Sequence, residues 1–327
     1  MTVDAQILRA LRQARDDAPV SGADLAEKLG ITRAAVWARI EDLRTLGYEI
    51  HASPHGGYKL RSAPDLLHAD DLLAMLGPDH LIGRDIQVFQ ETTSTNDVID
   101  KLGRDGVREG VVVFAESQTK GRGRLGRNWV SPKGKGLWFS ILLRPAMNPQ
   151  SATQITVAAA NAIARGIRQK TRLPAEIKWP NDILLGRKKV CGILTEMSAE
   201  LDKIKYVILG IGVDVNFNES DFPSELRLLA TSLKVELGHP VHRAELAADL
   251  LRELDADYHR ILDGHFESVA DEWERHCTTI GQHVEISAGP RKIEGQAESL
   301  DPEGALLIRT QHGRLERIIG GDVTLRT

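Results

Sequence analysis

The chain has 327 residues, 42% of them hydrophobic and 27% charged, which is ordinary for a globular protein and enough for about two or three domains. Its N-terminus lacks the basic-then-apolar order of a secretory signal, and no apolar run reaches the roughly 18 residues of a membrane span. Two cysteines, Cys191 and Cys277, are too few for a disulfide framework or a cysteine-bound metal, and they favour a cytoplasmic location. The net charge of -4 gives no overall sign of nucleic-acid binding.

Residues 1–64 predict a winged helix-turn-helix domain. Apolar residues at helical spacing predict a first helix over 4–16. Ser21 begins a second helix, and Thr32 caps a third beyond a turn that Gly30 permits. Two short strands around a Pro-His-Gly-Gly tip then predict the wing.

The third predicted helix offers a candidate DNA-binding surface. Its N-terminal half is expected to expose side chains where a recognition helix meets base edges and phosphates. These candidates are Thr32, Arg33, Trp37 and Arg39. Helix pairs across a glycine turn also occur in proteins that never bind DNA, so a purely structural domain is the alternative. Because the charge of this segment is nearly balanced, affinity for DNA would depend on a few placed contacts.

A linker at 61–64 leads into a central domain, residues 65–276, which is expected to combine helices and strands. Apolar strands are predicted at 111–115, 137–143, 176–179, 190–197 and 206–215, and helices at 96–102, 150–171 and 243–262. Neighbouring strands without intervening helices favour an α+β fold over a doubly wound one. The central domain is expected to be a mixed α/β domain whose sheet is largely antiparallel.

The last segment, residues 277–327, predicts a small β domain. Short strands at 283–287, 293–299, 305–310 and 314–319 are separated by turn signals such as Asp301-Pro-Glu-Gly304. A small closed barrel of the SH3-like kind fits this pattern best.

One loop of the central domain concentrates positive charge. Six lysines and arginines and no acid lie between Gln118 and Lys135, interleaved with glycines. Gly121-Arg-Gly-Arg-Leu-Gly126 matches the GxGxxG pattern, but no helix can start after it and no acid stands about 20 residues on, so a dinucleotide site is rejected. No kinase motif follows either. Guanidinium groups on a glycine loop suit phosphate and carboxylate oxygens, and an ordinary solvated loop is the alternative.

The motifs, in order, resemble those of biotin–protein ligases. Gly121-Arg-Gly-Arg-Leu-Gly-Arg127 resembles their biotin-binding loop, and Lys178-Trp-Pro-Asn-Asp182 their second hallmark. Thr93-Ser-Thr-Asn96, Lys189-Val-Cys-Gly-Ile-Leu-Thr-Glu196 and Gly210-Ile-Gly-Val-Asp-Val-Asn216 also match in place. With the winged helix and the barrel, the resemblance covers essentially the whole chain and is greatest to bifunctional members that also repress the biotin operon.

The resemblance implies a two-step reaction and roles for particular residues. Biotin and ATP would form biotinyl-5'-AMP with Mg²⁺, and a lysine of a carrier protein would then take the biotin. The biotin-binding set implied is Ser94, Thr95, Asn96, Gln118, Arg122, Gly123, Arg124 and Lys189. Because both reactants of the first step are anions, cations must stabilise the growing charge, and the candidates are Arg122, Arg124, Lys178 and Lys189. The nucleotide-binding set is Arg127, Trp129, Asn181, Asp214 and Asn216, with Asp182 as the metal ligand.

Each of these residues also has a plainer interpretation. Ser94–Asn96 could be an ordinary helix cap, Lys189 part of a solvated hairpin, Trp129 a core residue, and Asn181-Asp182 a common turn. Asp214 stands where many members carry asparagine, which puts its contact with adenine in doubt.

The partners implied are the biotin carboxyl carrier protein of acetyl-CoA carboxylase, operator DNA of biotin genes, and a second copy of the chain once the adenylate is bound. No membrane partner is expected. Three alternatives remain: a repressor without catalysis, a lipoate ligase, and a ligase whose N-terminal domain no longer reads DNA. Lys178, Lys189 and the three arginines of the loop argue against the first, and the loop together with the winged helix argues against the second.

Overall fold

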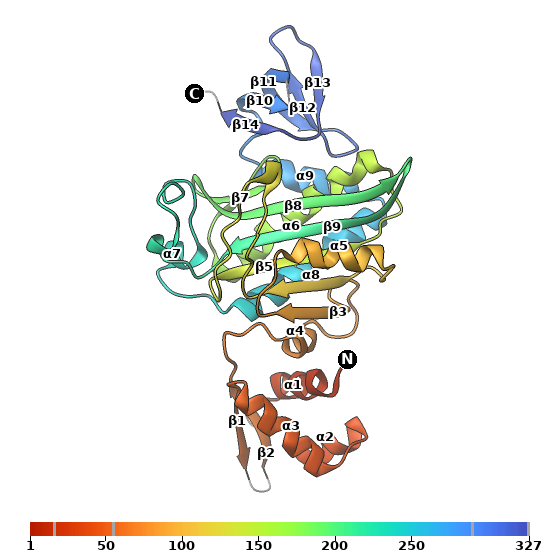
Figure 1. Cartoon of the computed structure of the whole chain (residues 1–327), viewed down its shortest axis with the longest axis vertical. Coiled ribbons are helices and arrows are strands. Elements are labelled where there is room, and N and C mark those ends of the chain that lie inside the picture. The colour runs from red at the N-terminus through yellow and green to blue at the C-terminus, as the bar shows by residue number, and fades with distance from the viewer. Residues whose placement is uncertain (16–17, 54–55, 289–290, 326–327) are drawn as a thin grey trace.

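The computed structural model describes residues 1–15, 18–53, 56–288 and 291–325 of the chain. Three parts follow one another along the long axis of the molecule: a small helical part at the N-terminus, a central sheet with helices, and a β part at the C-terminus (Figure 1).

The N-terminal part contains the predicted three helices and wing. Helices α1 (Val3–Gln13), α2 (Gly22–Leu29) and α3 (Arg33–Thr45) precede the antiparallel strands β1 (Glu49–Ser53) and β2 (Gly57–Ser62). The Ser21 and Thr32 hydroxyls cap α2 and α3 as expected, and Gly30 ends α2 in the left-handed region at φ 65°. The first helix ends at Gln13 rather than at residue 16. The predicted tip of the wing includes residues 54–55, which lie outside the described residues.

The N-terminal part is packed against the central one through helix α4 (Ala69–Leu76), which the sequence analysis did not predict. Helix α1 lies on α4 (Figure 1). The Arg12 guanidinium on α1 donates two hydrogen bonds, both of 2.7 Å, to the carboxylate of Asp71 on α4, which is fully buried. A paired, bidentate geometry satisfies this buried charge and fixes the orientation of the two helices.

The central sheet has seven strands in the order β3-β4-β5-β9-β8-β7-β6. Its strands are β3 (Asp85–Phe89), β4 (Val111–Ala115), β5 (Gly136–Leu143), β6 (Ala175–Lys178), β7 (Asp182–Leu185), β8 (Lys188–Glu200) and β9 (Lys203–Asp214). Only the β3–β4 pair is parallel, so the prediction of a largely antiparallel sheet is confirmed. The strands predicted at 190–197 and 206–215 form the long β8–β9 hairpin.

Helices cover the two faces of this sheet unequally. The long helices α6 (Thr153–Thr171) and α8 (Arg243–Leu262) pack together, and with α9 (Phe266–His276) they form the main core with one face. The other face carries α5 (Thr95–Arg104), which packs against β4, β5 and β9. The helix predicted over 150–171 is interrupted at its start, because Pro149–Ala152 forms the 3₁₀ turn η2 before α6 begins. The remaining short elements are the 3₁₀ turns η1 (Arg124–Gly126) and η3 (Glu219–Asp221) and helix α7 (Leu233–Leu237).

The C-terminal part is a five-stranded antiparallel sheet in the order β13-β12-β11-β10-β14. Its strands are β10 (His283–Ala288), β11 (Arg291–Leu300), β12 (Leu306–Arg309), β13 (Leu315–Ile318) and β14 (Asp322–Leu325). A closed barrel requires the two outer strands to pair, and within the described residues β13 pairs only with β12 and β14 only with β10. The sheet is therefore open where the sequence predicted a closed barrel.

Candidate active site

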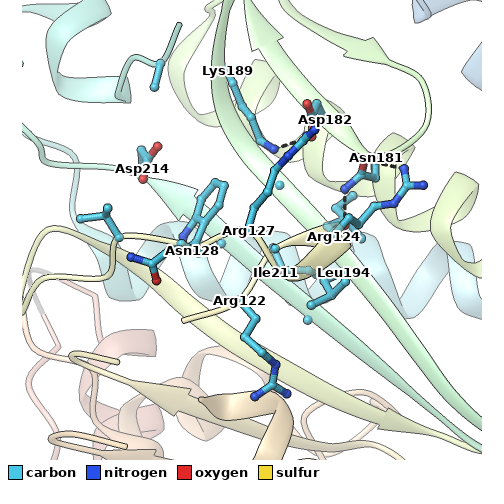
Figure 2. Close-up of a pocket in the computed structure, with 18 of the residues that line it drawn as sticks. Arg122, Arg124, Arg127, Asn128, Asn181, Asp182, Lys189, Leu194, Ile211 and Asp214 are labelled. Carbon is cyan, nitrogen blue, oxygen red and sulfur yellow. Dashed lines mark hydrogen bonds and ion pairs between the residues drawn. The ribbon is translucent and has the colours of Figure 1, made fainter. Parts of the chain in front are cut away.

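A cavity of about 640 Å³ opens on the face of the central sheet that carries α5. Its walls come from the glycine–arginine loop, from β6 to β9 and from the turn before β14. Figure 2 shows side chains of the loop and of β7 to β9 around it. The predicted site residues that line it are Ser94, Thr95, Asn96, Gln118, Arg122, Gly123, Arg124, Arg127, Trp129, Lys178, Asn181, Asp182, Lys189 and Asp214. Residues spread over 120 positions of sequence thus meet in one site.

Glycines on β8 and β9 make the floor of the cavity. A Cβ atom at Gly210 would lie 2.2 Å from Oδ1 of Asn96, and one at Gly212 would lie 2.5 Å from Nε1 of Trp129. Gly192, opposite Gly212 in the ladder, also faces the Trp129 ring, at 2.9 Å from its own Cβ position. Positions 210 and 212 therefore require glycine, because the side chains of Asn96 and Trp129 lie so close to the sheet there that a Cβ atom would collide with them.

One end of the cavity is a network of uncharged hydrogen-bonding groups, most of them buried, which ends at the partly exposed carboxylate of Glu196. The backbone N–H and the hydroxyl of Thr95 donate to Oε1 of Gln118 over 2.8 and 3.2 Å. The same hydroxyl lies 2.6 Å from that of Ser140, which donates to Oδ1 of Asn96 over 2.5 Å. The Asn96 amide in turn donates to Glu196 over 2.5 Å. A network of this kind holds its remaining donors and acceptors in fixed directions.

Ser94 belongs to the same end, and its side chain is not an ordinary helix cap. It occupies the N-cap position of α5 but makes no capping hydrogen bond. It is nevertheless buried, at 4% exposure, in the wall of the cavity. The N-cap residue of α5 is therefore part of the cavity wall.

The opposite end is cationic. The ammonium group of Lys189 lies 2.5 Å from Oδ1 of Asp182 and 5.1 Å from the centre of the Trp129 ring, a cation–π distance. The Arg124 guanidinium donates to Oδ1 of Asn181 over 3.2 Å, and the Asn181 amide is itself held by the carbonyl of Ile193 at 2.6 Å. In Figure 2, Lys189, Asp182 and Arg127 lie together, and Arg124 lies to one side of them against Asn181.

Arg122 lies apart from this cationic end. Its guanidinium donates to Oδ1 of Asp97 over 2.7 Å and lies 3.7 Å from the Glu196 carboxylate. Figure 2 shows it pointing away from Arg124, Arg127 and Lys189. Ion pairs with Asp97 on α5 and with Glu196 on β8 hold Arg122 beside the uncharged hydrogen-bonding end of the cavity.

The two remaining nucleotide candidates differ sharply in placement. Asp214 lines the cavity at 5% exposure, and burial raises the pKa of its carboxyl well above the usual aspartate range, opposed by the charge of Lys189. Asn216 is not among the residues that line the cavity. Its side-chain amide exchanges two hydrogen bonds of 2.9 Å with the backbone of Val241, and so ties the end of β9 to the approach of α8.

Several residues of the site were not predicted. Ser140 and Glu196 do not line the cavity, but both hydrogen-bond to Asn96, which does. Ser140 carried a signal, since it is a lone polar residue in the apolar run of β5, and Glu196 ended a motif that the sequence analysis quoted. Gly321 and Val323 line the cavity from the C-terminal part and gave no signal, because only the fold brings them there.

The predicted DNA-binding residues lie together at the start of α3. Arg33, Trp37 and Arg39 are exposed, Trp37 at 57%. The Thr32 hydroxyl is occupied, since it accepts the N–H of Ala35 over 3.1 Å as the cap of α3. Arg39 is partly neutralised, because it lies 3.6 Å from the Asp4 carboxylate.

Comparison with known proteins agrees with this arrangement. Three family models match: an HTH domain over residues 4–59, the Biotin/lipoate A/B protein ligase family over 88–214, and the Biotin protein ligase C terminal domain over 279–326. None of the helices in the described residues is long and apolar enough to cross a membrane.

Similar proteins span nearly the whole chain. It is 36% identical over 306 residues to the bifunctional ligase/repressor BirA of Bacillus subtilis (strain 168), covering 94% of each chain. It is 30% identical over 308 residues to BirA of Escherichia coli (strain K12), covering 94% of this chain and 93% of that one. The solved structure of biotin protein ligase from Aquifex aeolicus in complex with biotin and ATP matches with a TM-score of 0.63 at 31% identity, over 74% of this chain and 99% of that one. The chain therefore belongs to the family of bifunctional biotin protein ligases and repressors.

Proposed function

We propose that this protein is an ATP-dependent ligase that forms biotinyl-5'-AMP and transfers biotin to a lysine of the biotin carboxyl carrier protein of acetyl-CoA carboxylase, and that it represses biotin-synthesis genes. The observation that carries the ligase assignment is the division of one cavity into a neutral hydrogen-bonding end and a cationic end. A substrate that is neutral at its head and anionic at its tail fits both ends at once.

The neutral end suits the ring system of biotin. The ureido group carries one carbonyl and two N–H groups, so it needs both donors and acceptors and no charge. Ser94, Thr95, Asn96 and Gln118 supply hydroxyl and amide groups, all on buried or half-buried side chains whose positions the network fixes. Arg122 and Gly123 would lie along the side chain of biotin toward its carboxylate.

The cationic end suits the first chemical step. An oxygen of the biotin carboxylate attacks the α-phosphorus of ATP, a new P–O bond forms, and the bond to the bridging oxygen breaks to release pyrophosphate. Both reactants are anions, so preorganised cations lower the barrier by stabilising charge on the phosphorus oxygens. Arg124 and Lys189 are in place for this, with Lys178 and Arg127 on the wall beside them.

The second step needs no enzyme nucleophile. The neutral amine of a carrier lysine attacks the acyl carbon of the mixed anhydride, an amide forms, AMP leaves with the bond electrons, and the nitrogen loses a proton. The cavity must therefore keep water from the anhydride while leaving an opening for the lysine.

Recognition of the nucleotide would fall to Trp129 and Asp214 at the base, with Asn181 beside the phosphates. The donor set also fits Mg²⁺, which supplies charge neutralisation on phosphate oxygens when bound. Asp182 would hold the ion together with phosphate oxygens and water, the coordination that this cation favours. Among the described residues no cluster of three His, Cys, Asp or Glu side chains stands ready to hold a metal by itself, so the nucleotide would complete the site.

The decisive experiment is mass spectrometry of a carrier domain after incubation with the protein, biotin, ATP and Mg²⁺. The expected product is the carrier heavier by one biotinyl group, and Lys189→Ala and Arg124→Ala should slow its formation. A carrier whose mass does not change with the wild-type protein would overturn the ligase assignment. Modification by lipoate but not by biotin would replace it with lipoate ligation.

The regulatory part of the proposal concerns three domains: 1–64 for DNA binding, 65–276 for catalysis and 277–327 as an SH3-like β domain. We propose that two copies, paired when biotinyl-5'-AMP is bound, place their α3 helices on a palindromic operator, since one helix with few cations gives too little contact for tight binding. The site of action would be the cytoplasm, and the two free cysteines support this. A gel shift on the biotin-operon control region, with and without biotin and MgATP and repeated with Arg33→Ala, tests the proposal; affinity that ligand leaves unchanged would refute the coupling.

A further inference from the structure

The C-terminal part brings a glycine close to Arg124. An ideal Cβ atom built on Gly320 would lie 2.9 Å from a terminal nitrogen of the Arg124 guanidinium and 3.9 Å from its central carbon. Among the described residues, and apart from its chain neighbours, no other atom lies within 4 Å of that position. Its neighbour Gly321 lines the cavity itself. The turn between β13 and β14 is therefore part of the site wall.

The backbone does not explain why position 320 is glycine. Gly320 is not among the glycines with positive φ, so an L-amino acid could adopt its conformation without strain. Gly321, in contrast, is packed against the backbone of Ser287, 2.8 Å from its Cβ position. Of the described side chains, the one that a side chain at 320 would meet is that of Arg124.

We propose that Gly320 is a positioning residue for Arg124: its missing side chain leaves the space in which the guanidinium is held toward Asn181. This inference rests on the proposed ligase function. The guanidinium lies between the Asn181 amide of the central part and Gly320 of the C-terminal part. The C-terminal part thus determines how far this cation of the adenylation step reaches into the cavity.

The size of the effect follows from the contact. A methyl group at position 320 must reach at least the ordinary contact distance of 3.4 Å, so the guanidinium must retreat by about half an ångström. A misplacement of about 1 Å can cost about 100-fold in rate, so Gly320→Ala should slow adenylation by about 10-fold and Gly320→Val by more. The fold should survive, because only the end of a flexible side chain has to move.

The test separates the two steps of the reaction. Pyrophosphate release from biotin and MgATP is measured for the wild type, Gly320→Ala, Arg124→Ala and the double variant, with thermal melts of each. The expected result is a fall in kcat for Gly320→Ala at an unchanged melting temperature and unchanged affinity for biotin. In the Arg124→Ala background the second substitution should have no further effect, which general damage to the C-terminal part would not produce. Ile319→Ala, which trims the exposed neighbour on the same turn, is the matched control and should release pyrophosphate at the wild-type rate.

Two outcomes would overturn the inference while leaving the ligase assignment intact. One is wild-type pyrophosphate release by both Gly320→Ala and Gly320→Val. The other is a defect of Gly320→Ala that adds in full to that of Arg124→Ala. Absence of pyrophosphate release from the wild-type protein would instead refute the proposed function itself.

Discussion

Among the described residues, Arg243 makes the most strongly buried ion pair, and it allows a quantitative prediction. It is the first residue of α8, and its guanidinium donates to Oε2 of Glu116 over 2.7 Å, both side chains being at most 3% exposed. It also contacts the carboxylate of Asp65 at 3.2 Å and donates to the Asp65 carbonyl over 2.9 Å. Without Arg243, the buried Glu116 carboxylate would keep only the N–H of Leu67, at 3.2 Å.

The expected cost is therefore that of an unpaired buried charge. Removing one partner of a buried pair typically costs about 3–5 kcal/mol, and Arg243→Ala should lower the free energy of unfolding by this amount. Chemical denaturation followed by circular dichroism and tryptophan fluorescence measures the change. Arg252→Ala is the control on the same helix: its 40% exposed side chain pairs with Asp249 at i,i+3, a kind of pair worth at most about 1 kcal/mol.

A second variant tests the cause. Arg243→Met combined with Glu116→Leu removes both charges at similar volume, and buried pairs replaced in this way lose little or no stability. The double variant should therefore be clearly more stable than Arg243→Ala. A loss below about 1 kcal/mol for Arg243→Ala, or a double variant no better than the single one, would refute the reasoning.

Three further predictions concern the cavity and the DNA-binding helix. Burial raises the folded-state pKa of Asp214, so the stability that it contributes is present at acidic pH and is lost as pH rises from the ordinary aspartate range toward that raised pKa. Asp214→Asn should remove this decline from a series of thermal melts at different pH. Equal pH dependence of the melting temperature in the wild type and the variant would contradict this prediction. Gly210→Ala drives a methyl group into the Asn96 amide, so calorimetry should show weakened biotin binding and denaturation a loss of about 1–3 kcal/mol; wild-type affinity would mean that Asn96 does not bind biotin. Trp37→Ala removes an exposed side chain, so it should leave stability within about 0.5 kcal/mol yet weaken operator binding in a gel shift, and undiminished binding would remove α3 from the DNA interface.

Local sequence signals predicted the fold where an element is long or strongly apolar. The strand at 111–115 is buried at every position and was placed correctly, as was α8. Helix α9 could also have been found, since Phe266, Val269 and Trp273 follow helical spacing and form its buried face. The open C-terminal sheet could not have been predicted. Whether a barrel closes depends on pairing between its two outer strands, β13 and β14, and neither strand propensity nor residue spacing indicates which strands pair.

The sequence predicted which residues form the candidate site, but it did not predict which of them contact one another or where their side chains point. Ordered motifs placed Lys189, Asp182 and the loop arginines in one site, and all line the cavity. The direction of Arg122 depends on Asp97 and Glu196, which no pattern linked to it. The neighbour of Arg124 is a glycine almost 200 residues away, a contact that exists only once the C-terminal part has docked.

The buried pair between Arg12 and Asp71 has a consequence for the spacing of operator half-sites that the protein would accept. Because this pair holds α1 against α4, it links the domain that carries α3 to the catalytic domain. In the dimer proposed above, a small change in the angle between the two copies would then shift their α3 helices by a larger distance. The length of the spacer between the operator half-sites would then have to match the geometry of the dimer. Arg12→Ala, by loosening the contact between the N-terminal domain and the catalytic domain, would let the protein accept spacers of other lengths.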